Sequence, residues 1–274
     1  MTIQTPRLSP TIAHKLINES PLSAWAAHRL LGNFRKPPSD SQIAGRLWHA
    51  AVLEGAADVV PLPFKDFRTK DARLERDRVT EEGKIPVTQE KYDALLPAAE
   101  RIREELAAFG IVFDGAVEER LEWEERTEAG EAVLCSGYAD HFNGSVIHDL
   151  KTGSAAVSIH EAGRLIANSH AILQDAAYRS AVSKRDDLDP ERIEVVFAWV
   201  QTEEPFSVTP VTLAGDFREL SHLQWRRAIE TWHRCLSNGT DRKHWPGPVE
   251  QITPVSAPGW MISREIELEA MRDE

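Results

Sequence analysis

The pair Asn143-Gly144 is the sequence feature that most limits how this chain can fold. It separates two largely apolar runs, EAVLCSGYADHF and SVIHDLK, and an Asn-Gly pair between such runs is a strong β-hairpin signal. If these two residues form the turn, the pairing of the two strands follows from their numbering. Asp140 is then opposite Ile147, and Tyr138 is opposite Asp149.

This register places three charged side chains on one face of the hairpin. Asp140, Asp149 and Lys151 share that face, because opposed residues and residues two apart along a strand point the same way. As diagonal neighbours, Asp140 and Asp149 would have Cα atoms about 7–8 Å apart. Two carboxylates at that spacing can hold one hard divalent cation such as Mg²⁺ or Mn²⁺. A register shift of one residue would destroy the arrangement.

An alternative is that these charges form an exposed salt-bridge patch. From average composition, about one Asp-x-Lys triplet is expected by chance in a chain of this size. The second run, SVIHDLKTG, is mostly apolar before the acid and helical segments follow it, so we expect a central rather than a peripheral strand. Buried charges without a function are costly, which favours a functional site.

The rest of the pattern predicts a mixed α/β protein. Ser9-Pro10, Ser20-Pro21 and the segment from Ser39 to Gly55 predict three N-terminal helices, the last carrying His49. Residues 65–91 show no apolar periodicity, so we expect an exposed connection there. The other elements expected are a helix at 88–109, a strand at VEERLEWEE, helices at about 158–168 and 169–183, strands at RIEVVFAWVQ and FSVTPVTL (an edge strand because of Pro210), and a helix at about 216–236.

The predicted fold class is α/β, with a central mixed β-sheet, flanking helices and a helical N-terminal region. We expect residues 1–274 to form a single domain. Within it, residues 1–115 would be mainly helical, residues 116–240 would form the α/β core, and residues 241–274 would form a proline-rich tail.

Composition and charge limit the class of function. The net charge of −12 argues against a nucleic-acid partner, but residues 1–50 carry a net +4 while residues 97–131 carry a net −7. Cys135 and Cys235 are too few for an iron–sulfur cluster or a four-thiolate zinc site. No apolar run approaches the ~18–20 residues of a membrane span, and no apolar segment follows the first residues. The expected location is the cytoplasm, without membrane contact.

Four motifs in order resemble the PD-(D/E)xK nuclease superfamily. They are GRLWH at 45–49, GYAD ending at Asp140, DLKTG from Asp149, and QDAAY from Gln174 to Tyr178. Their order is similar to that in RecB- and RecE-like exonucleases. LSPTIAHKLINESPLSAWAAH and HWPG also resemble the RecE-like phage branch, the exodeoxyribonuclease VIII type. The departures are Ala139, where the family name has proline, and the shorter acid at Asp149.

The resemblance implies a restriction-endonuclease-like core and metal-dependent phosphodiester hydrolysis. Asp140, Asp149 and Lys151 would be catalytic, and Mg²⁺ or Mn²⁺ would be held by Asp140, Asp149, the Leu150 backbone carbonyl and His49. Gln174 and Tyr178, which are four apart on a helix and share a face, would lie beside the metal and help hold DNA. Whether Glu54, Glu118 or Glu119 joins the site stays open.

The same resemblance implies the substrate and partners. The protein would degrade linear double-stranded DNA from its ends, 5′ to 3′, in recombination, as a ring-like homo-oligomer beside a single-strand annealing protein. Basic N-terminal residues would form part of the DNA entrance: Arg7, Lys15, Arg29, Arg35, Lys36 and Arg46.

Three other functions are open on sequence grounds. Two use the same fold, as a PD-(D/E)xK endonuclease or as a non-catalytic DNA-end-binding module. The third, an HD phosphohydrolase suggested by His148-Asp149, is disfavoured because that motif belongs on a helix with further histidines.

Overall fold

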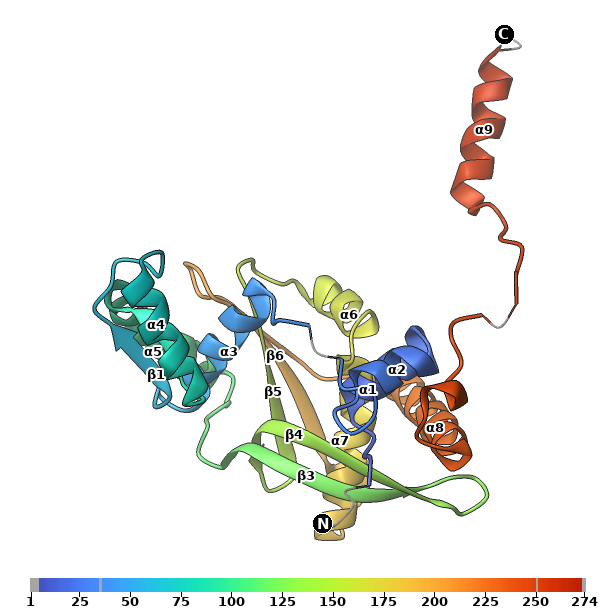
Figure 1. Cartoon of the computed structure of the whole chain (residues 1–274), viewed down its shortest axis with the longest axis horizontal. Coiled ribbons are helices and arrows are strands. Elements are labelled where there is room, and N and C mark those ends of the chain that lie inside the picture. The colour runs from blue at the N-terminus through green and yellow to red at the C-terminus, as the bar shows by residue number, and fades with distance from the viewer. Residues whose placement is uncertain (1–4, 35, 250, 273–274) are drawn as a thin grey trace.

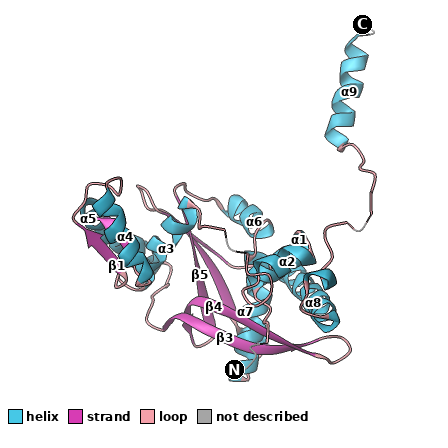
Figure 2. Ribbon diagram, viewed as in Figure 1, coloured by secondary structure: helices cyan, strands magenta, loops and turns pink. Residues whose placement is uncertain are grey.

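The computed structural model of the chain describes residues 5–34, 36–249 and 251–272. Figures 1 and 2 show a twisted β-sheet with helices on both sides. The helices are α1 (Pro10–Asn18), α2 (Pro21–Ala27), α3 (Asp40–Leu53), α4 (Lys70–Glu81), α5 (Gln89–Ala108), α6 (Ile159–Ala167), α7 (Ala171–Asp186), α8 (Gly215–Asn238) and α9 (Gly259–Arg272). The strands are β1 (Val59–Leu62), β2 (Ile85–Thr88), β3 (Ala116–Arg126), β4 (Ala132–Asn143), β5 (Val146–Gly153), β6 (Glu194–Gln201) and β7 (Val208–Val211).

The main sheet has five strands in the order β3-β4-β5-β6-β7. Strands β5 and β6 are parallel, and the other neighbours are antiparallel. The predicted α/β fold, with a mixed sheet, flanking helices and a helical N-terminal region, is therefore confirmed. The central position of β5 and the edge position of β7 are also confirmed. Proline has no backbone N–H to donate, and an edge strand such as β7 tolerates this at Pro210 because it has a neighbour on one side only. Strands β1 and β2 form a separate parallel pair.

Each face of the sheet has its own hydrophobic core. Along β6, Val195 and Phe197 pack in one core with helices α1, α7 and α8, whereas Ala198 and Val200 pack in the other with α3 and α5. This alternation is what a strand buried on both faces requires. Strand β5 lies between the two cores, so residues next to one another on it reach different sets of helices.

The N-terminal helices begin where the sequence predicts. The hydroxyls of Ser9, Ser20 and Ser39 accept hydrogen bonds from the backbone amides three residues later, at 3.3, 3.1 and 3.3 Å. Each satisfies an amide that the first helical turn leaves unpaired. The third cap fixes the start of α3, which packs on β4 and β5 and carries His49 toward the sheet.

The register predicted for the hairpin is wrong by two residues. The turn is Gly144-Ser145, and the pairs are Asn143↔Val146, Phe142↔Ile147 and His141↔His148. Gly144 has a φ of +64°, which suits the first central position of a type II′ turn, and Asn143 instead donates to Asp114 at 2.8 Å. A shift of two residues keeps Asp149 and Lys151 on one face of β5. Strand β4 does not alternate through Asp140, because Ala139 and Phe142 both pack in the core with α7 and α8.

Two segments differ from prediction. The segment expected to be an exposed connection contains α4 and β2, and β1 also precedes it. The tail contains α9, which Figure 1 shows extending away from the rest of the chain, with Trp260, Ile262 and Ile266 exposed. Among the residues that the structure describes, no helix is both long and apolar enough to cross a membrane.

The close packing around Gly115 gives a stability prediction. A Cβ atom there would lie 2.2 Å from the carbonyl oxygen of Phe142, so Gly115→Ala should destabilise the protein by about 1–3 kcal/mol. Gly163→Ala is the matched control, because Gly163 is helical with nothing within 4 Å of its added Cβ, and should stabilise by roughly 0.5–1 kcal/mol. Urea unfolding of both variants measures the difference. Equal effects would contradict the close approach.

Candidate metal centre

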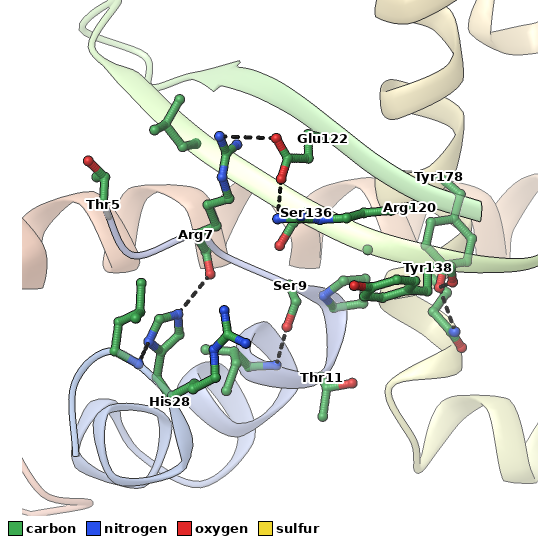
Figure 3. Close-up of a pocket in the computed structure, with 17 residues that line it drawn as sticks. Thr5, Arg7, Ser9, Thr11, His28, Arg120, Glu122, Ser136, Tyr138 and Tyr178 are labelled. Carbon is green, nitrogen blue, oxygen red and sulfur yellow. Dashed lines mark hydrogen bonds and ion pairs between the residues drawn. The ribbon is translucent and has the colours of Figure 1, made fainter. Parts of the chain in front are cut away.

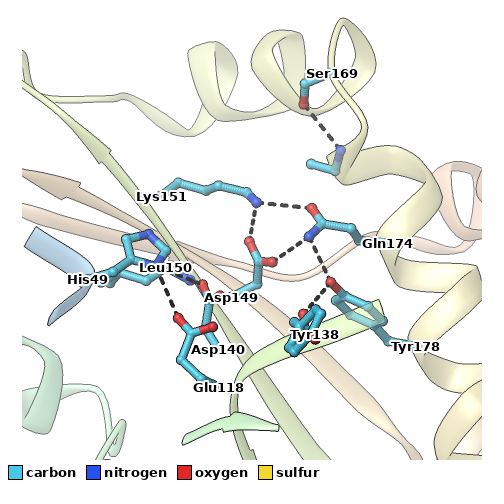
Figure 4. Close-up of polar contacts among 11 residues, drawn as sticks. His49, Glu118, Tyr138, Asp140, Asp149, Leu150, Lys151, Ser169, Gln174 and Tyr178 are labelled. Atoms are coloured by element: carbon cyan, nitrogen blue, oxygen red, sulfur yellow. Dashed lines mark hydrogen bonds and ion pairs between the residues drawn. The ribbon is translucent and has the colours of Figure 1, made fainter. Parts of the chain in front are cut away.

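The site forms where β4 and β5 separate. Their ladder ends at His141↔His148, and continuing its register puts Asp140 opposite Asp149. Instead of a further backbone bond, the amide of Leu150 donates to Asp140 Oδ2 at 2.7 Å. The Asp140 carboxylate therefore occupies the gap between the strands (Figure 4).

His49 and Glu118 complete a cluster of possible metal ligands around Asp140. His49 Nδ1 lies 3.6 Å from Asp140 Oδ2 and 4.0 Å from Glu118 Oε1. One ligand atom from each of the three residues lies within 4.8 Å of the others, a spacing at which one metal ion can bind all three. Carboxylate oxygens and a neutral imidazole are common ligands for divalent cations.

Among the three glutamates left open by sequence, the structure brings Glu118 to His49. Strands β3 and β4 pair so that Glu118 is opposite Asp140, whereas Glu119 bonds Arg185 of α7 at 2.7 Å. Glu54 lines a cavity of about 380 Å³ together with His49 and Glu118. The pairing of β3 with β4 is the signal that would have selected Glu118, but no short turn motif fixes its register.

The backbone at Glu118 is strained. Its φ is +50°, a left-handed conformation that costs a non-glycine residue about 1–3 kcal/mol. The strand also changes face here: Leu121 and Trp123 pack in the core with α7 and α8, while Val117 packs against the core with α3 and α5. The turn of the backbone at Glu118 thus aims its carboxylate at α3.

Asp149 is held by a chain of buried hydrogen bonds. Gln174 Nε2 donates to Asp149 Oδ1 at 2.7 Å and to the Tyr178 hydroxyl at 3.0 Å, and that hydroxyl donates to the Tyr138 carbonyl at 2.7 Å. Lys151 Nζ donates to Gln174 Oε1 at 3.0 Å and forms an ion pair with Asp149 Oδ2. The amide of Gln174 thereby fixes the orientation of both the acid and the lysine.

Burial and like charges shift the pKa values of the cluster. Burial, and then the charge of Asp149, raise the pKa of Asp140 well above its usual range. Burial and the charge of Glu54 raise the pKa of Glu118. Burial lowers the pKa of His49, so its imidazole keeps the lone pair that a metal needs. A divalent cation bound among these acids would favour their ionised forms.

One further observation tests whether a cation fits. The cluster offers two carboxylates and one imidazole within reach of a single ion, and oxygen and imidazole ligands suit divalent cations. Asp149 is outside this cluster, and its buried Oδ2 pairs with Lys151 Nζ. The residues therefore fit a divalent cation, without defining which one.

A groove adjoins the site (Figure 3). It has a volume of about 860 Å³ and is lined by the N-terminal segment, β3, β4 and α7. Arg7 lies 3.2 Å from Glu122, which also pairs with Arg120, while Arg29 has no hydrogen bond or ion pair to the described part of the chain. Tyr138 is 56% exposed here.

The predicted site residues divide into two neighbouring groups. His49 and Asp140 meet with Glu118 in the cluster, while Asp149, Lys151, Gln174 and Tyr178 form the hydrogen-bond chain. The Leu150 backbone raises the pKa of His49, against the larger effect of burial, and a metal contact of the Leu150 carbonyl stays a prediction. Gln174 and Tyr178 are buried, at 6% and 3% exposure, so they act first on Asp149; their contact with DNA stays a prediction.

The basic N-terminal residues predicted for the DNA entrance are dispersed. Arg7 and Arg29 line the groove, but Lys15 bonds Glu19 at 3.0 Å and Arg46 donates to the Gly83 carbonyl at 2.7 Å. Lys36 is exposed, and Arg35 lies outside the described residues.

The fold and site define a class of α/β proteins with an acidic cluster at the centre of a mixed sheet. Among solved structures, the chain is similar to a crystal structure from Eubacterium rectale described as a "Putative exonuclease", with a TM-score of 0.57 and 13% identity over 92% of this chain and 91% of that one. This likeness establishes a shared fold. The crystal structure of SSO0001 matches with a TM-score of 0.30 and 12% identity over 69% of this chain and 86% of that one. That TM-score is too low to indicate a shared fold. No protein-family model and no curated protein matches the sequence.

The raised pKa of Asp140 predicts a pH-dependent gain of stability in Asp140→Asn. The folded carboxyl binds its proton more tightly than the unfolded one, so it lowers stability as pH rises from the ordinary aspartate pKa toward the raised value. Without divalent metal, Asp140→Asn should therefore melt at a higher temperature than the wild type at pH 8 and at the same temperature near pH 4. Thermal unfolding in EDTA measures both, with the exposed Asp241→Asn as control. A lower melting temperature at pH 8 would contradict this.

Proposed function

We propose that this protein is a metal-dependent exonuclease that hydrolyses linear double-stranded DNA from its ends, in the 5′ to 3′ direction. The proposal assigns it to the RecE-like branch of the PD-(D/E)xK nucleases, with residues 1–274 as one nuclease domain. Asp140, Asp149 and Lys151 are its catalytic residues.

One observation carries the proposal. Two acids from neighbouring strands meet where those strands separate, next to a lysine two residues along and an imidazole from a separate helix. Metal-dependent phosphodiester hydrolysis uses a divalent cation, a positioned water and a positive charge near the phosphate. Asp140, His49 and Lys151 provide groups for these needs within one site.

The cation and Lys151 would have different roles in the hydrolysis. When bound, a divalent cation would lower the pKa of a coordinated water and neutralise charge on the phosphate. Lys151, held by Gln174 and Asp149, orients the attacking water or balances the charge that develops on the phosphate oxygens. The water oxygen bonds to phosphorus as it loses a proton to solvent or to a basic group, the bond from phosphorus to the 3′ oxygen breaks, and that oxygen takes up a proton.

The groove offers a place for the DNA strand that leads into the site. Gln174 and Tyr178 border both the groove and the hydrogen-bond chain, so the two are continuous. Arg7, Arg29 and Arg120 bring positive charge, which suits a phosphate backbone although the chain as a whole is acidic.

End dependence separates the exonuclease from its alternatives. With Mg²⁺ or Mn²⁺, the protein should degrade end-labelled linear duplex DNA progressively from the 5′ ends and leave covalently closed circles intact, and EDTA should stop the reaction. Asp149→Asn should lose all activity, because an amide binds a hard cation poorly. Cutting of circles at a similar rate would favour the endonuclease. Binding without any cutting would favour the non-catalytic module.

The role of Lys151 predicts a separation of rate from affinity. Lys151→Ala should lower kcat by roughly 10²–10⁴-fold with little change in DNA affinity, because its charge acts mainly in the transition state. Single-turnover rates and equilibrium binding to labelled DNA in Ca²⁺ measure the two effects. Lys184→Ala is the matched control, because Lys184 lies near the other end of α7 from Gln174 and pairs with Glu125 instead of a site residue. Parallel losses of rate and binding in Lys151→Ala would make Lys151 a ground-state phosphate contact.

A further inference from the structure

Two buried histidines lie next to the acids of the site. His141 and His148 follow and precede Asp140 and Asp149 in the sequence, and their Nδ1 atoms are 2.9 Å apart. Their rings are stacked, with centroids 5.2 Å apart and planes at 16°. The Phe113 ring makes T-shaped contacts with both, at centroid distances of 5.2 and 6.4 Å. Neither histidine belongs to the metal cluster.

The hydrogen bond between the two rings has a definite direction. The amide of Gly115 donates to His141 Nε2 at 2.9 Å, so that nitrogen carries a lone pair. Neutral His141 therefore holds its proton on Nδ1 and donates it to Nδ1 of His148. Both rings are neutral in this arrangement, consistent with burial, which lowers the pKa of each and that of His148 to about 4.

The histidine pair lies at the point where β4 and β5 separate. His141↔His148 is the final backbone pair between β4 and β5, and the next position on each strand is a site acid. Along β5, neighbouring residues point to opposite faces, so His148 lies on the face opposite Asp149. The two imidazoles join β4 and β5 directly next to the site acids. Gly115 packs on the pair from outside, where a Cβ would lie 3.0 Å from His141 Nε2.

We propose that His141 and His148 are positioning residues, whose hydrogen bond fixes the angle at which β4 and β5 diverge and so the separation of the Asp140 and Asp149 carboxylates. The proposal rests on the function proposed above, in which these carboxylates bind a divalent cation. The ladder has only three backbone pairs beside the turn, so little else joins these two strands directly. A displacement of a ligand by about 1 Å is enough to weaken a metal site.

Two amide substitutions of His148 distinguish the effect of the hydrogen bond from the effect of side-chain size or polarity. In His148→Asn the side-chain oxygen can stand where Nδ1 stands and accept from His141, whereas in His148→Gln the acceptor moves one bond further out. Mn²⁺ affinity, measured by calorimetry at 25 °C, should fall about 10–100-fold in His148→Gln and stay within about threefold of the wild type in His148→Asn. DNA hydrolysis by His148→Gln should recover partly at high Mn²⁺.

A core substitution controls for lost stability. Ile229→Ala, at a fully buried position of α8, should lower the melting temperature without changing Mn²⁺ affinity. If His148→Gln binds Mn²⁺ as tightly as the wild type, or if His148→Asn is weakened to the same extent, the positioning role is overturned. A wild-type protein that binds no Mn²⁺ would instead overturn the proposed metal site, and this inference with it.

Discussion

The divergence of β4 and β5 is the constraint on which the rest of the site depends. Beyond His141↔His148 the two strands no longer pair through their backbones, and the amide of Leu150 needs another acceptor. The Asp140 carboxylate supplies it at 2.7 Å. One hydrogen bond therefore satisfies a buried amide of the central strand and fixes an acid from its neighbour at the gap.

Strand β5 distributes its residues between two cores, and this brings distant helices to one site. Asp149 points toward α7, where Gln174 bonds it, while Leu150 packs in the core that contains α3. His49 reaches Asp140 from α3. The alternation of a doubly buried strand thus explains how His49, about 90 positions before Asp140, and Gln174, 25 positions after Asp149, reach the same site.

The site is arranged at some cost in stability. Glu118 has a left-handed backbone, which costs about 1–3 kcal/mol against a typical folding free energy of about 5–15 kcal/mol. Burial and mutual repulsion also raise the pKa values of Asp140 and Glu118. A bound cation would relieve this repulsion, so the arrangement suits function better than stability.

Local signals in the sequence determined most of the elements. Serine caps defined the first helices, and Pro210 marked the edge strand. Charge-rich α4 escaped prediction because it buries little apolar surface, with only Ala72 and Val79 inside, so no periodicity marks it.

The hairpin and the candidate site separate what the sequence determined from what the tertiary structure decided. The sequence Asn143-Gly144-Ser145 predicted a turn, but glycine can occupy either central position of a two-residue turn. Two strand registers, which differ by two residues, were therefore both compatible with the sequence. The face shared by Asp149 and Lys151 followed from sequence alone, because a strand alternates with period two whichever turn forms. The contact of Asp140 with His49 of α3 did not, because β4 and β5 separate at Asp140. The choice of Glu118 over Glu119, the hydrogen bonds of Gln174 and the histidine pair came only from tertiary structure, since each depends on contacts between segments that no local pattern aligns.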